Sequence, residues 1–409
     1  MDKKKLHQYA EVVVKKALQL KKNQILYVEA LLETSEFVYA LAEEAYKVGA
    51  AEVAVNWKSN RLEQIKLLSC DGPQIGKLSE LDYATIDYYA QKGAAFVRIE
   101  SPDLDIFKDV PTEKIQRKAL GDRESRNRYR EKSQGTGAGS TIICVPTAPW
   151  AKVVFPNLPE AEALEKLWEY VFTCVRVNEP DPLKAWDDFV ANTRKRRSLL
   201  NAKKYVTFHY KSPVTDLYMS PIDEQFWCGG CNDTDDPEVY CIPNVPTEEV
   251  FTCPHKYKVN GYVTSTMPLN YRGRIINDFR LTLKDGKVVD YSAKEGEDVL
   301  KTILETDNGS CYFGEMALID ASSPISRLHT TFYTTLYDEN ASCHIALGLG
   351  LGGSEGMTPE EREAKGINTS ALHVDFMVGS PDLNIQGQLP DGTWEDVFIN
   401  GSWAPAFQI

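Results

Sequence analysis

The alternation of β-rich runs with helical patterns in the first half of the chain constrains its fold more than any other feature. Four β-rich runs occur, at residues 24–29, 51–57, 94–100 and 140–146. Helical patterns precede, separate and follow them, at residues 3–21, 35–48, 78–92, 112–132, 159–174 and 182–200. Strands that alternate with helices form parallel sheets, because each helix returns the chain to the end of the sheet at which the previous strand began. We therefore expect residues 1–200 to form an α/β domain with a doubly wound, mostly parallel sheet.

The second half has a different pattern. Runs such as 205–210 and 279–283 alternate apolar and polar residues. The sequence Lys284-Asp285-Gly286-Lys287 predicts a two-residue hairpin, since Asp-Gly tolerates the positive φ angles of a type I′ turn. A second hairpin is expected at 390–393, and short helices at 295–306 and 358–365. Residues 201–409 are therefore expected to form an α+β, largely antiparallel domain.

Charge is divided unequally between these halves. Residues 201–409 contain 15 basic and 30 acidic side chains, whereas residues 1–200 contain 31 basic and 29 acidic ones. An acidic surface argues against nucleic acid or an anionic membrane as a partner and favours metal ions or amine-bearing substrates. The basic cluster at 193–198 is interpreted as a solvated helix end.

The chain shows no sign of export. No apolar run approaches the ~18–20 residues of a membrane helix, and the N-terminus is amphipathic without the apolar block of a signal peptide. Nine cysteines, an odd number, suggest reduced thiols rather than a disulfide framework. We expect a cytoplasmic protein.

A glycine-rich run at 348–353 satisfies the G-x-G-x-x-G pattern of dinucleotide-binding proteins, with Asp375 further along. In that motif a helix begins at the third glycine, so that its N-terminus meets the pyrophosphate. Here the cap pattern Thr358-Pro-Glu-Glu361 starts five residues later. An NAD-dependent oxidoreductase is therefore only a minor alternative.

Acidic and histidine side chains within apolar runs form a third candidate site. His373 and Asp375 are two residues apart in a β-rich run, so their side chains point to the same face of a strand. An imidazole and a carboxylate aimed at one point suit a divalent metal. The remaining candidates are Glu248, Glu249, Glu315 and His344. A buried histidine is also commonly just a hydrogen-bonded core residue, and spacing alone leaves both interpretations open.

Several segments resemble the M29 family of metallo-aminopeptidases, the thermophilic aminopeptidase T group. The specific ones in the second half are 246–252, 259–266, 314–318, 323–326, 338–348 (Asp-Glu-Asn-Ala-Ser-Cys-His-Ile-Ala-Leu-Gly) and 373–380. Segments 45–50, 93–96, 150–155 and 165–168 extend the resemblance to the first half. The resemblance thus covers nearly the whole chain.

This resemblance implies a hydrolase that releases N-terminal amino acids from peptides with a free N-terminus. It implies a homodimer, an α/β domain over 1–200 and a metal-binding catalytic domain over 201–409. Two divalent ions (zinc, cobalt or magnesium) would be bound, because mixed nitrogen and oxygen ligands discriminate poorly between these metals. The implied ligands are Glu249, Glu315, His344, His373 and Asp375. Glu315 would bridge both ions, and Glu248 is a candidate general base.

One position departs from the family pattern. A tyrosine usually stands seven residues after the ligand histidine, and here that position is Leu351. Unless Tyr333 or Tyr337 replaces the missing phenol, we expect slower turnover or an altered substrate range. A metal-binding relative with weak peptidase activity is therefore the second hypothesis.

Overall fold

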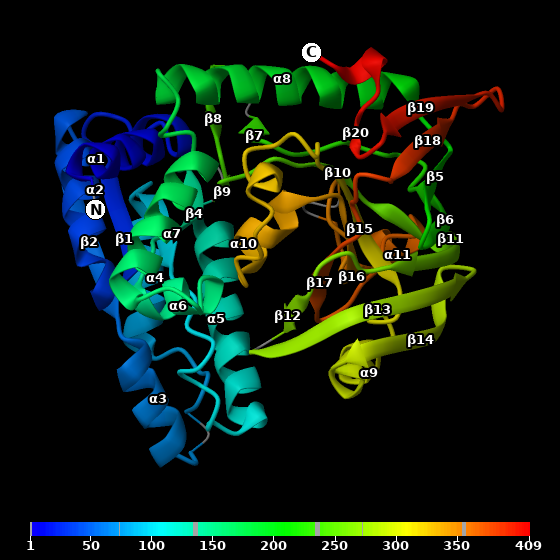
Figure 1. The fold of residues 1–409 in the computed structure, drawn as a ribbon. Coiled ribbons are helices and arrows are strands. Elements are labelled where there is room, and N and C mark those ends of the chain that lie inside the picture. The colour runs from blue at the N-terminus through cyan, green and yellow to red at the C-terminus, as the bar shows by residue number, and fades with distance from the viewer. Residues whose placement is uncertain (1, 73, 134–137, 234–237, 272, 354–356) are drawn as a thin grey trace. The chain divides into compact units, whose positions relative to one another are not determined.

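The computed structural model describes residues 2–409 apart from 73, 134–137, 234–237, 272 and 354–356. These residues form two compact units (Figure 1). The first comprises Met1–Asp187 with Cys231–Pro246, and the second comprises Asp188–Gly230 with Thr247–Ile409. A short segment from the second half of the sequence therefore belongs to the first unit. The assignment of residues 1–200 to an α/β domain and of residues 201–409 to a metal-binding catalytic domain stays a prediction.

The first unit contains a parallel five-stranded sheet in the order β2-β1-β3-β4-β9. Its strands are β1 (Ile25–Leu31), β2 (Glu52–Lys58), β3 (Ala95–Glu100), β4 (Ser140–Cys144) and β9 (Asn244–Val245). The first four match the predicted β-rich runs, and the doubly wound parallel fold is confirmed. The sequence pattern missed β9, because two residues are too few to show an alternation. A small antiparallel pair, β7 (Asn232–Asp233) and β8 (Tyr240–Cys241), completes the strands of this unit.

Helices connect these strands. They are α1 (Lys3–Val12), the π-helix η1 (Val13–Ala17), the 3-10 turn η2 (Leu32–Thr34), α2 (Ser35–Lys47), α3 (Asn60–Ser69), α4 (Glu80–Gln91), α5 (Thr112–Ser133), α6 (Ala148–Val154), α7 (Glu160–Cys174) and the start of α8 (Pro182–Lys203). Local chemistry sets several of their starts: Asp2 caps α1, and Ser79 forms a capping box with Asp82 at α4. The helices α3 and α6 were not predicted.

The second unit contains two antiparallel sheets, as expected. The larger follows the order β12-β13-β11-β6-β5-β18-β19-β20, with β14 paired to β13, and the smaller follows β10-β15-β16-β17. Their strands are β5 (Thr207–Ser212), β6 (Thr215–Pro221), β10 (Val250–Thr252), β11 (Pro254–Thr264), β12 (Leu269–Tyr271), β13 (Arg274–Lys284), β14 (Lys287–Glu295), β15 (Phe313–Leu318), β16 (His344–Gly348), β17 (His373–Met377), β18 (Asn384–Gln388), β19 (Trp394–Ile399) and β20 (Ser402–Trp403). We call the four-stranded one the small sheet.

One apolar core joins the two sheets of the second unit. Phe376 of β17 packs against Phe279 of β13, with 5.2 Å between ring centroids, and against Phe313 of β15, at 5.9 Å. All three rings are almost completely buried. The small sheet is therefore fixed on one face by the core, which leaves its other face for polar side chains.

Turns and short helices complete this unit. Asp285 and Gly286 both have positive φ, at 49° and 81°, so the predicted β13–β14 hairpin is confirmed. The loop 389–393 likewise joins β18 to β19. The helices are α9 (Glu297–Leu304), α10 (Thr335–Asp338), α11 (Pro359–Ala364) and the 3-10 turns η3 (Ser326–Leu328), η4 (Glu339–Ala341) and η5 (Pro405–Phe407).

The basic cluster at 193–198 was interpreted wrongly in part. Thr193 is 2% exposed and Arg197 is 9% exposed. Arg196 donates from Nε to the carbonyl oxygen of Phe407 and lies 5.3 Å above the ring of Trp403. The cluster lies within α8, which continues to Lys203, so one side of it packs inward instead of remaining solvated.

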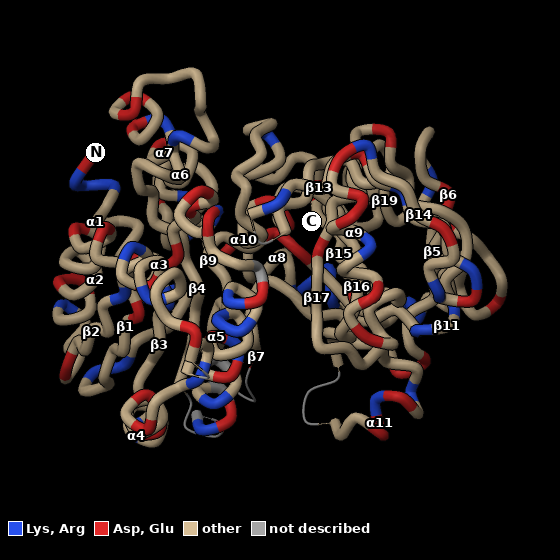
Figure 2. The backbone as a smooth tube through the Cα atoms, turned by 90° about the horizontal axis from the view of Figure 1, so that it is seen from below, with Lys and Arg blue, Asp and Glu red and all other residues tan. Residues whose placement is uncertain are grey.

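Charge on α5 does have the pattern of a solvated helix. Basic and acidic residues follow one another closely along it (Figure 2). Arg117 pairs with Glu113 and Lys118 with Asp122, each four residues apart.

Among the helices that the structure describes, none has the length and apolar character needed to cross a membrane.

Candidate metal centre

The small sheet places four candidate side chains on one face. Glu315 of β15 pairs with Ala346 of β16, which in turn pairs with Asp375 of β17. His344 and His373 each precede this row by two residues on their own strand. Because side chains alternate along a strand, His344, His373 and Asp375 lie on the face away from the core. Glu315 joins them because the β15 register shifts between Phe313 and Glu315, so that Phe313 faces the core and Glu315 faces away from it.

Their polar atoms come close together. Nε2 of His344 lies 3.5 Å from Oε1 of Glu315, and Nε2 of His373 lies 3.3 Å from Oε2 of the same carboxylate. Oδ1 of Asp375 is 3.2 Å from Nε2 of His373 and 4.0 Å from Nε2 of His344. Glu315 therefore lies between the two imidazoles, with one oxygen toward each.

Glu249 joins this group from outside the three strands. It immediately precedes β10, and its Oε2 lies 3.4 Å from Nε2 of His344. Two sets of three residues could each hold an ion, with ligand atoms within 4.8 Å of one another. We call Glu249, Glu315 and His344 the first trio, and Glu315, His373 and Asp375 the second trio. Glu248 belongs to neither.

Both histidines are oriented by the backbone. Nδ1 of His344 lies 2.7 Å from the carbonyl oxygen of Glu339, and Nδ1 of His373 lies 2.8 Å from that of Leu349. A carbonyl oxygen only accepts, so each Nδ1 carries a proton and donates it. In the neutral imidazole the lone pair is then on Nε2, which points at the carboxylates. This is the arrangement of histidines that ligate metals.

Burial and crowding perturb the acids and bases of the cluster. Glu315 is 4% exposed and His344 1% exposed. Burial, with the charge of Glu315 adding to it, raises the pKa of Glu249 to about 8. Burial lowers the pKa of His344, but the hydrogen bond with Glu315 and the charge of Glu249 outweigh it and raise that pKa to about 10. The cluster thus contains more buried negative charge than its own residues neutralise.

Glu339 was missed by sequence reasoning. Burial and the charges of Asp375, Glu249 and Glu315 raise the pKa of its carboxyl well above the usual value. Its Oε1 accepts a hydrogen bond of 3.3 Å from Nδ2 of Asn340. Glu339 begins η4, a turn rather than a strand, so the period-two argument that found its neighbours could not find it.

The residues present fit a divalent cation. Such ions prefer imidazole nitrogen and carboxylate oxygen, and the two trios supply both within one buried space. A buried anion without a counter-charge is costly, and the raised pKa of Glu249 records that cost. A positive ion at either trio would remove it.

The glycine-rich run does not have the geometry of a dinucleotide site. Gly348 ends β16, a strand of an antiparallel sheet, and the next helix is α11, which starts at Pro359. The run instead packs against β15: a Cβ on Gly314 would lie 2.3 Å from the carbonyl oxygen of Leu349 and 2.4 Å from that of Gly348. The glycines therefore support the carbonyl that orients His373, and the oxidoreductase alternative is not favoured.

Leu351 lies in this same run. Its backbone N–H donates to the carbonyl oxygen of Gly314, at 3.0 Å, one residue before Glu315. Of the two tyrosines considered as replacements, Tyr337 is fully buried and packs on Phe332, with 4.9 Å between ring centroids. Tyr333 is half-buried and has a φ of 58°. Replacement of the phenol by either one stays a prediction.

Comparisons with known proteins give concordant results. The sequence profile described as thermophilic metalloprotease (M29) matches residues 2–403. Aminopeptidase 2 of Geobacillus stearothermophilus is 39% identical over 405 residues, with 98% of each chain covered. Aminopeptidase T of Thermus thermophilus is 33% identical over 403 residues, again with 98% of each chain covered. The solved structure of wild-type AmpT from Thermus thermophilus superposes with a TM-score of 0.90 at 32% identity, over 98% of this chain and 99% of that one.

Proposed function

The chain belongs to the M29 family of thermophilic metalloproteases, and from this premise we propose that it is a metal-dependent aminopeptidase acting on the free N-terminus of peptides. Relatives named as aminopeptidases match almost its full length. The observation that carries the proposal is the pair of trios joined through Glu315, with each histidine Nε2 directed at the carboxylates.

Two divalent ions would be held, one by each trio. Glu249 and His344 would ligate the first ion, His373 and Asp375 the second, and Glu315 would bridge them with its two oxygens. When bound, such ions supply Lewis-acid polarisation of a carbonyl group and activation of water near neutral pH. Zinc, cobalt and magnesium all suit the mixed donor set.

The protein's own residues would bind and orient the substrate around that centre. The free α-amine of a peptide would pair with a carboxylate beside the centre or offer its lone pair to an ion, and an acetylated N-terminus can do neither. The proton acceptor is proposed to be a carboxylate outside the trios. Glu248 is one candidate, and Glu339, whose raised pKa reflects burial beside the cluster, is the other.

The dimer is proposed from the family resemblance, and the cytoplasmic location from the nine cysteines, an odd number that suggests reduced thiols. We expect a cytoplasmic homodimer, and sedimentation analysis of the purified protein would test the dimer. A second candidate function, metal binding with weak turnover, is favoured by one observation: Leu351 stands where the family has a tyrosine.

The decisive experiment uses an aminoacyl-p-nitroanilide and its N-acetylated form. We expect hydrolysis of the first only, loss of activity in EDTA, and recovery with Co²⁺ or Zn²⁺. Unchanged activity in the fully metal-stripped protein, verified by metal analysis, would contradict the proposal. Bound metal without turnover would favour the second candidate.

A further inference from the structure

Two asparagines in the second unit are completely buried beside the candidate metal centre. Asn340 and Asn368 are each 0% exposed. Burying a side-chain amide is unfavourable unless its polar atoms are hydrogen-bonded. Neither residue belongs to a trio. The hydrogen bonds that they make show what each one holds.

Asn340 holds the segments on both sides of the first trio. Its Oδ1 accepts from the backbone N–H of Glu248, at 2.7 Å, which fixes the residue next to Glu249. Its Nδ2 donates to the carbonyl oxygen of Leu336, at 3.0 Å, and to Oε1 of Glu339. The carbonyl of Glu339 is in turn the acceptor for Nδ1 of His344. One amide thus ties Glu249 and His344, the two unshared members of this trio, to each other.

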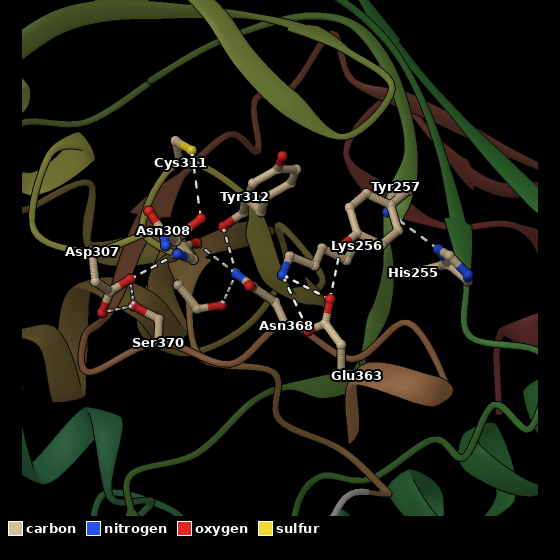
Figure 3. Close-up of polar contacts among 12 residues, drawn as sticks. His255, Lys256, Tyr257, Asp307, Asn308, Cys311, Tyr312, Glu363, Asn368 and Ser370 are labelled. Carbon is tan, nitrogen blue, oxygen red and sulfur yellow. Dashed lines mark hydrogen bonds and ion pairs between the residues drawn. The ribbon is translucent and has the colours of Figure 1, made fainter. Parts of the chain in front are cut away.

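Asn368 holds the glycine-rich run through Nδ2 and its backbone carbonyl, whereas its buried Oδ1 has no hydrogen-bond partner among the described residues. Its Nδ2 donates to the carbonyl oxygens of Gly348, at 2.6 Å, and of Gly309, at 2.7 Å, and more weakly to that of Tyr312 (Figure 3). Its backbone carbonyl accepts from the N–H of Gly350, at 2.8 Å.

The position of Leu349 follows from these bonds. Asn368 contacts the residues immediately before and after it, Gly348 and Gly350. The carbonyl of Leu349 accepts from Nδ1 of His373. Asn368 therefore acts on His373, an unshared member of the second trio, and none of its side-chain hydrogen bonds reaches a member of the first trio.

We propose that Asn340 and Asn368 are positioning residues, each for one half of the metal centre: Asn340 for the first trio and Asn368 for the second. This inference rests on the proposed two-metal function. Partners that orient metal ligands typically contribute ~10–100-fold to metal affinity, because a misplaced imidazole or carboxylate loses its bond geometry. The consequence is that the affinity for each ion can be lowered separately by substitutions that alter no ligand.

The test measures Co²⁺ affinity at one half while the other half is disabled. Glu249→Gln removes a ligand of the first trio, and Asp375→Asn removes one of the second. In the Asp375→Asn background, Asn340→Ala should weaken the remaining Co²⁺ site ~10–100-fold and Asn368→Ala less than about threefold. In the Glu249→Gln background, Asn368→Ala should weaken the remaining Co²⁺ site ~10–100-fold and Asn340→Ala less than about threefold.

Two further sets of variants separate positioning from loss of folding. Asn340→Thr and Asn368→Thr nearly keep the side-chain volume and add no charge but remove the Nδ2 donors, so they should give the same pattern if the alanine variants unfold. Asn384, a half-buried residue at the start of β18 in the larger sheet, is a control because its amide also bridges two backbone groups, those of Asp382 and Asn400. Asn384→Ala should lower the melting temperature and leave both Co²⁺ affinities unchanged.

The outcomes are distinguishable. If either asparagine variant weakens both halves equally, or neither half, the inference fails even when the peptidase activity is intact. If the wild-type protein binds a single Co²⁺ ion, the two-metal proposal fails instead. Selective weakening in the expected backgrounds supports the assignment.

Discussion

Oε2 of Glu249, the residue before β10, lies 3.4 Å from Nε2 of His344 at the start of β16, although 95 residues separate them in the sequence. Glu248, its neighbour in sequence, instead engages Asn340 through its backbone N–H. Adjacent glutamates thus occupy different environments, and the difference can be measured.

We expect Glu249→Gln to weaken metal binding and peptidase activity by at least ~10–100-fold, because it removes a candidate ligand. Metal-free, the same variant should be more stable than wild type, since it relieves crowding among buried carboxylates. Metal titration and thermal unfolding with and without EDTA would measure both. Glu248→Gln is the control: it should keep metal affinity, and a fall in kcat alone would identify the proton acceptor. Retained affinity in Glu249→Gln would refute the ligand assignment.

Gly314→Ala should disturb the site through packing. Its Cβ would lie 2.3 Å from the carbonyl oxygen of Leu349, which orients His373. Overpacking of this kind costs ~1–3 kcal/mol, and we expect reduced metal affinity as well. Gly392→Ala is the matched control, because it has a φ of 88° but no neighbour within 4 Å. It should cost roughly 1 kcal/mol from backbone strain and leave metal affinity unchanged. Equal effects of the two variants on metal affinity would contradict the argument.

Leu351→Tyr should raise kcat by up to ~10²-fold, the order of magnitude of one hydrogen-bond donor to a developing oxyanion. The backbone N–H of Leu351 donates to the carbonyl oxygen of Gly314, the residue before Glu315. Leu351→Phe provides the ring without the hydroxyl and should give no such gain. Steady-state kinetics on one p-nitroanilide substrate compares them. A gain shared by both variants would mean that the ring, not the phenol, matters.

The turn before Glu339 should make stability depend on pH. Burial raises the pKa of Asp338 to about 7, against ~3.9 in an unfolded chain, even though its carboxylate accepts from the N–H groups of Phe332 and Thr334. The neutral form is favoured by folding, so this contribution is complete below pH ~4 and is lost as pH rises through 7. Asp338→Asn should remove that part of the decline in melting temperature between pH 5 and 8. Parallel pH profiles for both proteins would exclude the assignment.

Chelation should loosen the second unit selectively. Removing metal leaves Glu249, Glu315 and Asp375 buried together without the divalent ions, so the small sheet should open more readily. Hydrogen exchange with and without EDTA would show faster exchange in β15, β16 and β17, and no change in the parallel sheet of the first unit. Equal protection in both states would contradict this expectation.

Local patterns carried much of the prediction. The four β-rich runs became β1 to β4, and the Asp285-Gly286 turn became the β13–β14 hairpin, because strand period and turn chemistry are properties of adjacent residues. For the same reason His373 and Asp375 were expected on one face, and the structure brings them there. Elements of two residues, such as β9, and helices without a marked apolar stripe, such as α3, carried no comparable signal.

The sequence by itself determined which residue types were available for metal chemistry and which strand faces carried them. The family resemblance favoured Glu249 over Glu248 as a ligand. Only the tertiary structure brings Oε2 of Glu249 to Nε2 of His344 and places Glu339 beside them. Such contacts depend on strand register and on the path of a turn, and the spacing of residues in the sequence predicts neither. The acceptors that orient His344 and His373 are backbone carbonyls, which every residue possesses. No side-chain pattern can identify them, so their role becomes visible only when the chain is folded.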